Sequence, residues 1–136
     1  MKKVLVLLLL MVSTSVFAEW TPVDGSKDGD MTVYIDFGTI KRKGNKVKMW
    51  KLYDFKTVKK LAVKKLGEND RYLSGVFYTE YDCEEETGRM LDLYLYSGNM
   101  RQGDIVYSHK NIKEEAESII PQSIEESLFK IACDKK

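Results

Sequence analysis

Apolar and polar residues alternate along two stretches in the middle of the chain. One is Tyr72–Cys83, and the other, Met90–Ser97, alternates more clearly. Because successive residues of a strand point to opposite faces, each stretch predicts a strand with one buried face. The residues expected to face the core are Leu73, Phe77, Tyr81, Cys83, Leu91, Leu93 and Leu95.

Shorter extended segments fill much of the remaining chain. Strand-forming residues predict further strands at Glu19–Val23, Met31–Asp36, Val47–Phe55 and Asp104–His109. Polar turns that contain glycine separate these strands, at 24–30, 43–45 and 97–99. The body of the chain is therefore expected to be an antiparallel sheet of about five to six strands.

The end of the chain changes to a helical period. An apolar stripe recurs at helical spacing and consists of Ile124, Leu128, Ile131 and Ala132. Ser123 and Glu126 have the spacing of a capping box at its start. A helix of about three turns is too short to be stable alone, so it is expected to pack on one face of the sheet. The fold class is therefore α+β. The expected contact surface for the helix is formed by Leu91, Leu93, Leu95, Phe77 and Tyr81.

The N-terminal segment has the parts of an export signal. Two lysines come first, Val4–Val12 is apolar, and Val16-Phe17-Ala18 suits signal peptidase. Residues 1–18 are therefore predicted to be a signal peptide and residues 19–136 one mature domain. A retained N-terminal anchor is the alternative, which the short apolar run disfavours. No cysteine follows the cleavage region, so we expect a chain exported to the periplasm or outer surface and not a lipoprotein.

Cys83 and Cys133 are the two cysteines of the chain. Export places them in an oxidising compartment, where a structural disulfide is the expected state. This bond would tie the C-terminal helix to a strand of the sheet. A redox-active pair is the alternative, which the absence of Cys-x-x-Cys spacing disfavours.

Charge and side-chain inventory argue against several classes of function. The net charge of +1 becomes −1 when the two lysines of the signal peptide are removed, so a nucleic-acid partner is not expected. His109 is the only histidine, and no spacing suggests a catalytic triad or a histidine metal site. We therefore expect no enzyme activity, no metal and no cofactor. The acidic residues around Cys83 could bind calcium, but a solvated strand end is the simpler interpretation; they are Glu80, Asp82, Glu84, Glu85 and Glu86.

An ordered set of short segments along the mature chain resembles the surface-adhesin protein E family of Gram-negative bacteria. The segments are Trp20, Val33–Asp36, Thr39–Arg42, Val47–Asp54, Tyr72–Ser74, Glu80–Cys83, Tyr96–Gly98 with Gly103, Pro121–Ser123 and Leu128–Cys133. The resemblance implies an antiparallel sheet with a C-terminal helix that a disulfide ties to one face. It also implies binding of host extracellular-matrix proteins such as laminin and vitronectin. The alternative is a structural periplasmic or envelope protein that acts through homodimerisation.

Two surfaces are candidates for partner binding. The first is a set of tyrosines expected on the sheet face away from the helix: Tyr72, Tyr78, Tyr94 and Tyr96. Tyrosine combines a large contact area with a polar tip and is enriched in protein interfaces. Ordinary cross-strand pairing on a solvated face is the alternative interpretation.

The second candidate is the lysine-rich segment from Lys56 to Leu66. Its lysines are Lys56, Lys59, Lys60, Lys64 and Lys65. Wound as a helix, the segment would place its apolar residues together and could make peripheral contact with envelope lipid or glycan. The alternative is a solvated connection whose charges protect a sheet edge from other chains.

Overall fold

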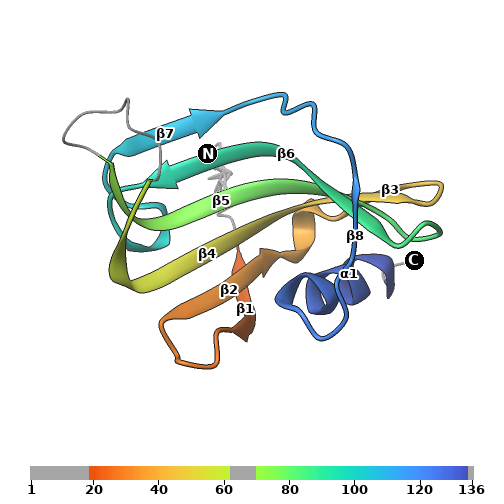
Figure 1. Ribbon diagram of the computed structural model, residues 1–136, viewed down its shortest axis with the longest axis horizontal. Coiled ribbons are helices and arrows are strands. Elements are labelled where there is room, and N and C mark those ends of the chain that lie inside the picture. The colour runs from red at the N-terminus through yellow and green to blue at the C-terminus, as the bar shows by residue number, and fades with distance from the viewer. Residues whose placement is uncertain (1–18, 62–69, 135–136) are drawn as a thin grey trace, which may run out of the picture.

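Eight strands form one antiparallel sheet in the computed structural model, which describes residues 19–61 and 70–134 (Figure 1). The strands are β1 (Trp20–Gly25), β2 (Met31–Asp36), β3 (Lys41–Lys43), β4 (Lys46–Lys60), β5 (Arg71–Asp82), β6 (Thr87–Tyr96), β7 (Ile105–His109) and β8 (Glu117–Ser118). Six of them lie in the order β1-β2-β4-β5-β6-β7, while β3 pairs with β4 and β8 pairs with β6. The predicted antiparallel sheet is confirmed, and β3 and β8 are short strands beyond those expected. The predicted signal peptide lies outside the described residues.

The helix α1 (Ile124–Asp134) lies against one face of the sheet, beside β1 and β2 (Figure 1). Leu128 and Ala132 are fully buried, as the apolar stripe predicts. The Glu126 backbone N–H donates to Ser123 Oγ at 3.2 Å, so Ser123 caps the helix as predicted. The Glu126 side chain binds Lys130 instead of completing a capping box.

The core beneath α1 comes mainly from β2 and β4. Its fully buried sheet residues are Val33, Ile35, Val47, Met49 and Tyr81. Tyr81 occupies the predicted position, and its ring contacts Phe129 edge to face at 5.9 Å. Alternate positions of β2 and β4 therefore supply most of the fully buried sheet residues of this core.

The expectation that Leu91, Leu93 and Leu95 lie under the helix is wrong. None of them belongs to the core cluster around Leu128. A bulge shifts the β5–β6 register between Tyr78 and Thr79 and leaves Leu91 without a partner position on β5. Leu93 and Leu95 pair with Phe77 and Gly75 at positions beyond α1, whose main contacts are with β1, β4 and β5.

The disulfide between Cys83 and Cys133 is confirmed, with the two Cα atoms 5.7 Å apart. Cys83 follows the last residue of β5, and Cys133 lies in the last turn of α1. Arg42 Nη1 also donates to the Cys133 carbonyl at 3.1 Å. The C-terminal end of the helix is therefore fixed both to the end of β5 and to β3.

A second apolar cluster lies on the sheet face opposite α1. Its buried members are Leu52, Val76 and Tyr96. Partly buried residues complete the cluster: Trp20, Tyr34, Trp50, Tyr94 and Met100. The face that the alternation assigns to polar residues is thus largely aromatic.

Candidate functional site

A groove of about 380 Å³ opens on the aromatic face of the sheet, opposite α1. Side chains from five strands and two short 3-10 turns line it: Trp20, Asp36, Thr39, Trp50, Val76, Tyr94, Tyr96 and Arg101. We call this site the aromatic groove. Trp, Tyr and Arg are the residues that most often dominate binding energy in protein interfaces.

Aromatic rings from three neighbouring strands contact one another in and beside the groove. Trp50 on β4 lies directly opposite Tyr78 on β5. Their ring centroids are 4.8 Å apart and the planes are inclined by 19°, which is a stacked arrangement. Tyr94 tilts against Trp50 from the next strand but one, with centroids 6.2 Å apart. The sheet therefore presents these rings as one rigid surface.

Arg101 reaches the groove from η2 (Asn99–Arg101), the turn after β6. Its guanidinium lies over the Tyr96 ring, 5.7 Å from the centroid, as a cation–π contact. Met100 and Arg101 both have left-handed backbone conformations, with φ of 52° and 64°. Two consecutive non-glycine residues in this region are strained, and such strain persists only where surrounding contacts impose it.

Hydrogen bonds from two strands impose this conformation. The Met100 backbone N–H donates to Asp54 Oδ1 at 2.8 Å, and the Arg101 N–H donates to Ser74 Oγ at 3.0 Å. Ser74, which is fully buried, also donates to the Gly98 carbonyl at 2.6 Å. β4 and β5 thus hold η2 in the conformation that places Arg101 over the groove.

The structure brings three of the four candidate tyrosines together on the face opposite α1. Tyr94 and Tyr96 line the aromatic groove, and Tyr78 stacks on Trp50 beside it. Burial, followed by the nearby carboxylates of Asp92 and Glu80, raises the pKa of Tyr78 and keeps the phenol neutral. Tyr72 lies apart from this group, because its ring contacts Phe55 edge to face at 5.9 Å.

The lysine-rich segment begins as a strand. Lys56, Lys59 and Lys60 belong to β4, so the helical alternative is wrong for these residues. Lys59 Nζ lies 2.6 Å from Asp30, a contact that raises the pKa of Lys59 and lowers that of Asp30. Lys56 and Lys60 are exposed. Lys64 and Lys65 lie outside the described residues.

Of the eight described residues that line the groove, the sequence analysis proposed only Tyr94 and Tyr96 as candidates; the six that it missed include Trp20, Trp50 and Arg101. The alternation of Val47, Lys48, Met49 and Trp50 in β4 could have placed Trp50 on the face opposite the core, with Tyr78 and Tyr94. Arg101 has no such signal, because its position depends on the conformation of η2.

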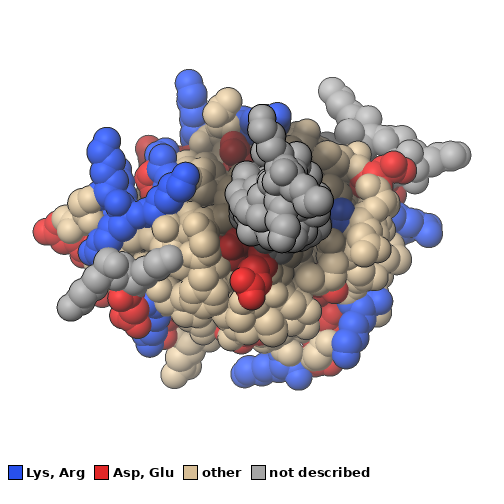
Figure 2. All heavy atoms as spheres, turned by 180° about the vertical axis from the view of Figure 1, so that it is seen from behind, with Lys and Arg blue, Asp and Glu red and all other residues tan. Residues whose placement is uncertain are grey.

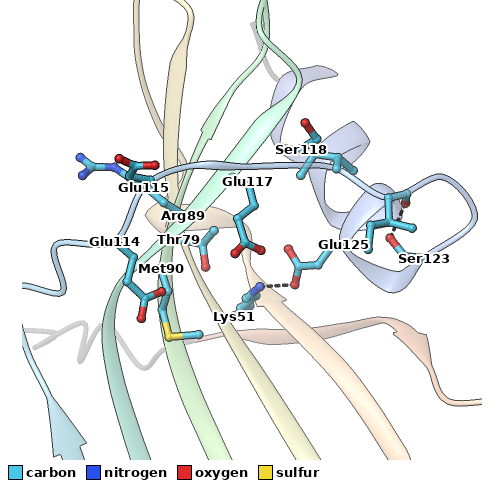
Figure 3. A pocket seen from close by; sticks show the side chains of 13 residues that line it. Lys51, Thr79, Arg89, Met90, Glu114, Glu115, Glu117, Ser118, Ser123 and Glu125 are labelled. Atoms are coloured by element: carbon cyan, nitrogen blue, oxygen red, sulfur yellow. Dashed lines mark hydrogen bonds and ion pairs between the residues drawn. The ribbon is translucent and has the colours of Figure 1, made fainter.

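A pocket of about 290 Å³ lies on the other face of the sheet, beneath the segment that leads into α1 (Figure 3). Lys51 projects from β4 on the pocket floor and binds Glu125 of the helix. Tyr53 and Tyr81 donate their hydroxyls to the same carboxylate, each at 2.8 Å. Glu117 points into the pocket from the crossing segment (Figure 3).

Burial is the largest influence on this ion pair. The Lys51 side chain is 5% exposed, and its burial lowers the pKa of the ammonium group even though Glu125 opposes the change. Burial also raises the pKa of Glu125, but the Lys51 charge and the hydrogen bonds from Lys51, Tyr81 and Tyr53 outweigh it and leave the pKa below its usual value. Both oxygens of the carboxylate are engaged, so the cluster joins α1 to the sheet.

Three of the acidic residues around Cys83 have other partners: Glu80, Asp82 and Glu84, which accepts from Asn45 Nδ2. Glu80 accepts from Arg89 Nε at 3.0 Å. Asp82 accepts the backbone N–H groups of Glu84 and Glu85 at 3.1 Å and 3.0 Å. Within residues 19–61 and 70–134, no three His, Cys, Asp or Glu residues are grouped so that they could hold a metal ion.

No helix in the described part of the chain has the length and apolar character needed to cross a membrane.

Comparison with solved structures shows the same fold in protein E of Haemophilus influenzae. Its crystal form II superimposes with a TM-score of 0.62 at 18% identity, over 83% of this chain and 87% of that one. The selenomethionine form gives a TM-score of 0.61 at 18% identity, over 90% and 91% of the two chains. Protein E from non-typeable Haemophilus influenzae gives 0.60 at 18% identity, over 89% and 79%.

Sequence comparison supplies the family. No curated protein matches the chain significantly. The model of the family described as surface-adhesin protein E matches residues 20–134, which span both apolar clusters, the disulfide and the aromatic groove. The chain therefore belongs to the surface-adhesin protein E family.

Proposed function

We propose that this protein is a non-catalytic adhesin that binds a host extracellular-matrix protein of the laminin or vitronectin type through the aromatic groove. Its family consists of adhesin-like surface proteins, and the predicted signal peptide is consistent with export to the cell surface.

The composition and rigidity of the groove carry the proposal. Trp20, Trp50, Tyr94 and Tyr96 supply a large aromatic surface, and Arg101 adds a planar cation at its margin. The rings are already fixed by stacking and burial, so little side-chain entropy is lost when a partner binds. A partly buried aromatic pocket with one cation is typical of the centre of a protein interface.

The lysine-rich segment is proposed as an electrostatic contributor to this binding. Lys56 and Lys60 are exposed at the end of β4, and Lys64 and Lys65 follow them in the sequence. Exposed charges act mainly on the rate of association and are screened by salt. Binding carried by these lysines should weaken steeply with ionic strength, whereas binding carried by the aromatic groove should weaken little.

Arg101→Ala is expected to weaken binding to laminin or vitronectin by about tenfold or more, because hot-spot truncations cost about 2 kcal/mol or more. Arg101 is exposed, so the fold should survive its replacement. The measurement is surface plasmon resonance of the oxidised protein over each immobilised matrix protein at physiological salt. Arg71→Ala, which removes another exposed arginine that does not line the groove, is the matched control.

Equal affinities for the Arg101 and Arg71 variants would contradict the assignment of the groove. Light scattering over a range of concentrations tests the alternative of a structural homodimer. A tight dimer that Trp20→Ala dissociates, without matrix binding by either form, would assign the aromatic groove to self-association.

A further inference from the structure

The β3–β4 hairpin concentrates positive charge that the sequence analysis did not single out. Five of the eight residues from Lys41 to Lys48 are basic, and Gly44 and Asn45 form the turn. Gly44 has φ of 62°, which a two-residue hairpin turn with glycine at its first position requires. The tight turn brings the two basic runs side by side.

The register of the hairpin places lysine opposite lysine. Lys41 pairs with Lys48 and Lys43 pairs with Lys46. Directly opposed residues on antiparallel strands share a face and lie close together, and like charges in such pairs are destabilising. Four ammonium groups therefore share one small area of surface at a cost to the folded state.

These four lysines lie on the sheet face away from α1. Between them, Arg42 pairs with Val47, which is buried beneath the helix, and Arg42 binds the Cys133 carbonyl. Alternation then places the lysines on the opposite face. Figure 2, which views the molecule from that side, shows Lys and Arg side chains gathered at the end of the sheet where the hairpin lies.

A single carboxylate offsets this charge only in part. Glu80 lies 3.9 Å from Lys46 Nζ and 3.8 Å from Lys48 Nζ, and it also binds Arg89 at 3.0 Å. Lys41 and Lys43 are exposed and make no ion pair with any described residue. A hollow of about 320 Å³ lies among these side chains, with the Tyr78 ring in its wall. The hollow is therefore lined mostly by cationic side chains, with Glu80 as the one carboxylate among its described residues.

We infer that the β3–β4 hairpin binds a sulfated polysaccharide, with sulfate groups on the four lysines and a neighbouring sugar ring on the Trp50–Tyr78 stack. Trp50 follows Lys48 on the same face of β4, and Tyr78 precedes Glu80 on the same face of β5. The lysines that would bind the sulfate groups therefore adjoin the aromatic surface that would contact a sugar ring. The inferred site shares Trp50 with the aromatic groove but requires neither Trp20 nor Arg101, so loss of heparin binding and loss of matrix binding can be told apart.

Heparin is the probe that tests this inference. The oxidised protein should bind immobilised heparin, with affinity that falls as salt increases. Lys41→Gln/Lys43→Gln should weaken binding by about tenfold or more, because two contacting charges are lost without disturbing the partners of Glu80. Lys27→Gln/Lys113→Gln removes the same net charge from exposed sites elsewhere and should keep binding within about twofold of the parent.

Two further variants keep the test decisive. Lys41→Arg/Lys43→Arg retains the charge and should retain heparin binding. Trp50→Phe retains a smaller aromatic ring and all four lysines. It should therefore weaken heparin binding less than Lys41→Gln/Lys43→Gln does. Equal weakening by the hairpin pair and the control pair would overturn the inference, as would tighter binding to phosphatidylglycerol vesicles than to heparin.

Discussion

Glu125→Ala is expected to lower the free energy of unfolding by about 3–5 kcal/mol, because it leaves Lys51 buried without its counter-charge. The same change removes the acceptor of the Tyr53 and Tyr81 hydroxyls, which then lack their partner beneath α1. Chemical denaturation followed by circular dichroism measures the effect. It should exceed that of an exposed ion pair of the same helix, such as the one between Glu126 and Lys130.

A double variant separates the value of the ion pair from the cost of breaking it. Lys51→Met/Glu125→Leu replaces both charges by apolar side chains of similar size and should recover much of the lost stability. Glu126→Ala is the matched single control, because it removes a carboxylate from the next position of α1. A loss below about 1 kcal/mol for Glu125→Ala would mean that water reaches Lys51 in the folded protein.

The same carboxylate gives the stability a dependence on acid. The pKa of Glu125 in the folded protein lies below its ordinary value of 4.5, so folding favours the ionised form. Its contribution to stability is fully present above pH 4.5 and is lost as the pH falls through the lower folded-state pKa. Glu125→Gln lacks this ionisation, so the stability difference between parent and variant should shrink below pH 4.5. A difference that is constant with pH would contradict the assignment.

Replacing both cysteines, as Cys83→Ser/Cys133→Ser, is expected to cost about 2–5 kcal/mol. The disulfide joins residues separated by 50 positions and restricts the unfolded chain, for which the loop-entropy model gives roughly 4 kcal/mol. Loss of the bond should also loosen the last turn of α1, since Cys133 anchors it. Urea denaturation of the parent and the variant measures the change.

Reductant supplies the control for this experiment. Dithiothreitol should lower the stability of the parent toward that of the double variant and should leave the variant unchanged. Matrix binding through the aromatic groove should survive in any variant that remains folded, because the groove lies on the other face of the sheet from α1. A parent protein indifferent to reductant would contradict a stabilising role for the disulfide.

The spacing of apolar residues and the pair of cysteines made the fold predictable from the sequence. The alternation in β5 and β6, the apolar stripe of α1 and the paired cysteines each depend on local spacing or on compartment. The bulge opposite Tyr78 and Thr79 was not predictable, because one unpaired residue changes the register without altering the composition. It leaves Leu91 unpaired, whereas Leu93 and Leu95 still pair with Phe77 and Gly75.

The candidate site was predicted only in part. Tyr78, Tyr94 and Tyr96 follow from strand parity, whereas Arg101 depends on hydrogen bonds between η2 and residues on β4 and β5. The buried ion pair of Lys51, on the other face of the sheet, could not be predicted from the sequence either. A lysine flanked by apolar residues looks exposed until its partner Glu125, 74 positions away, is known.

The long strand β4 (Lys46–Lys60) constrains the length of this chain more strictly than the identity of its side chains. One face of β4 carries Val47, Met49 and Lys51, and the opposite face carries Lys48, Trp50 and Leu52. Substitutions could adjust either face separately during evolution or engineering. A one-residue deletion within β4 would turn the residues on one side of it to the opposite face, so that a lysine such as Lys48 would point into the core and an apolar residue such as Met49 away from it. Diversity among relatives should therefore arise in β4 by replacement, and length changes should be confined to the turns.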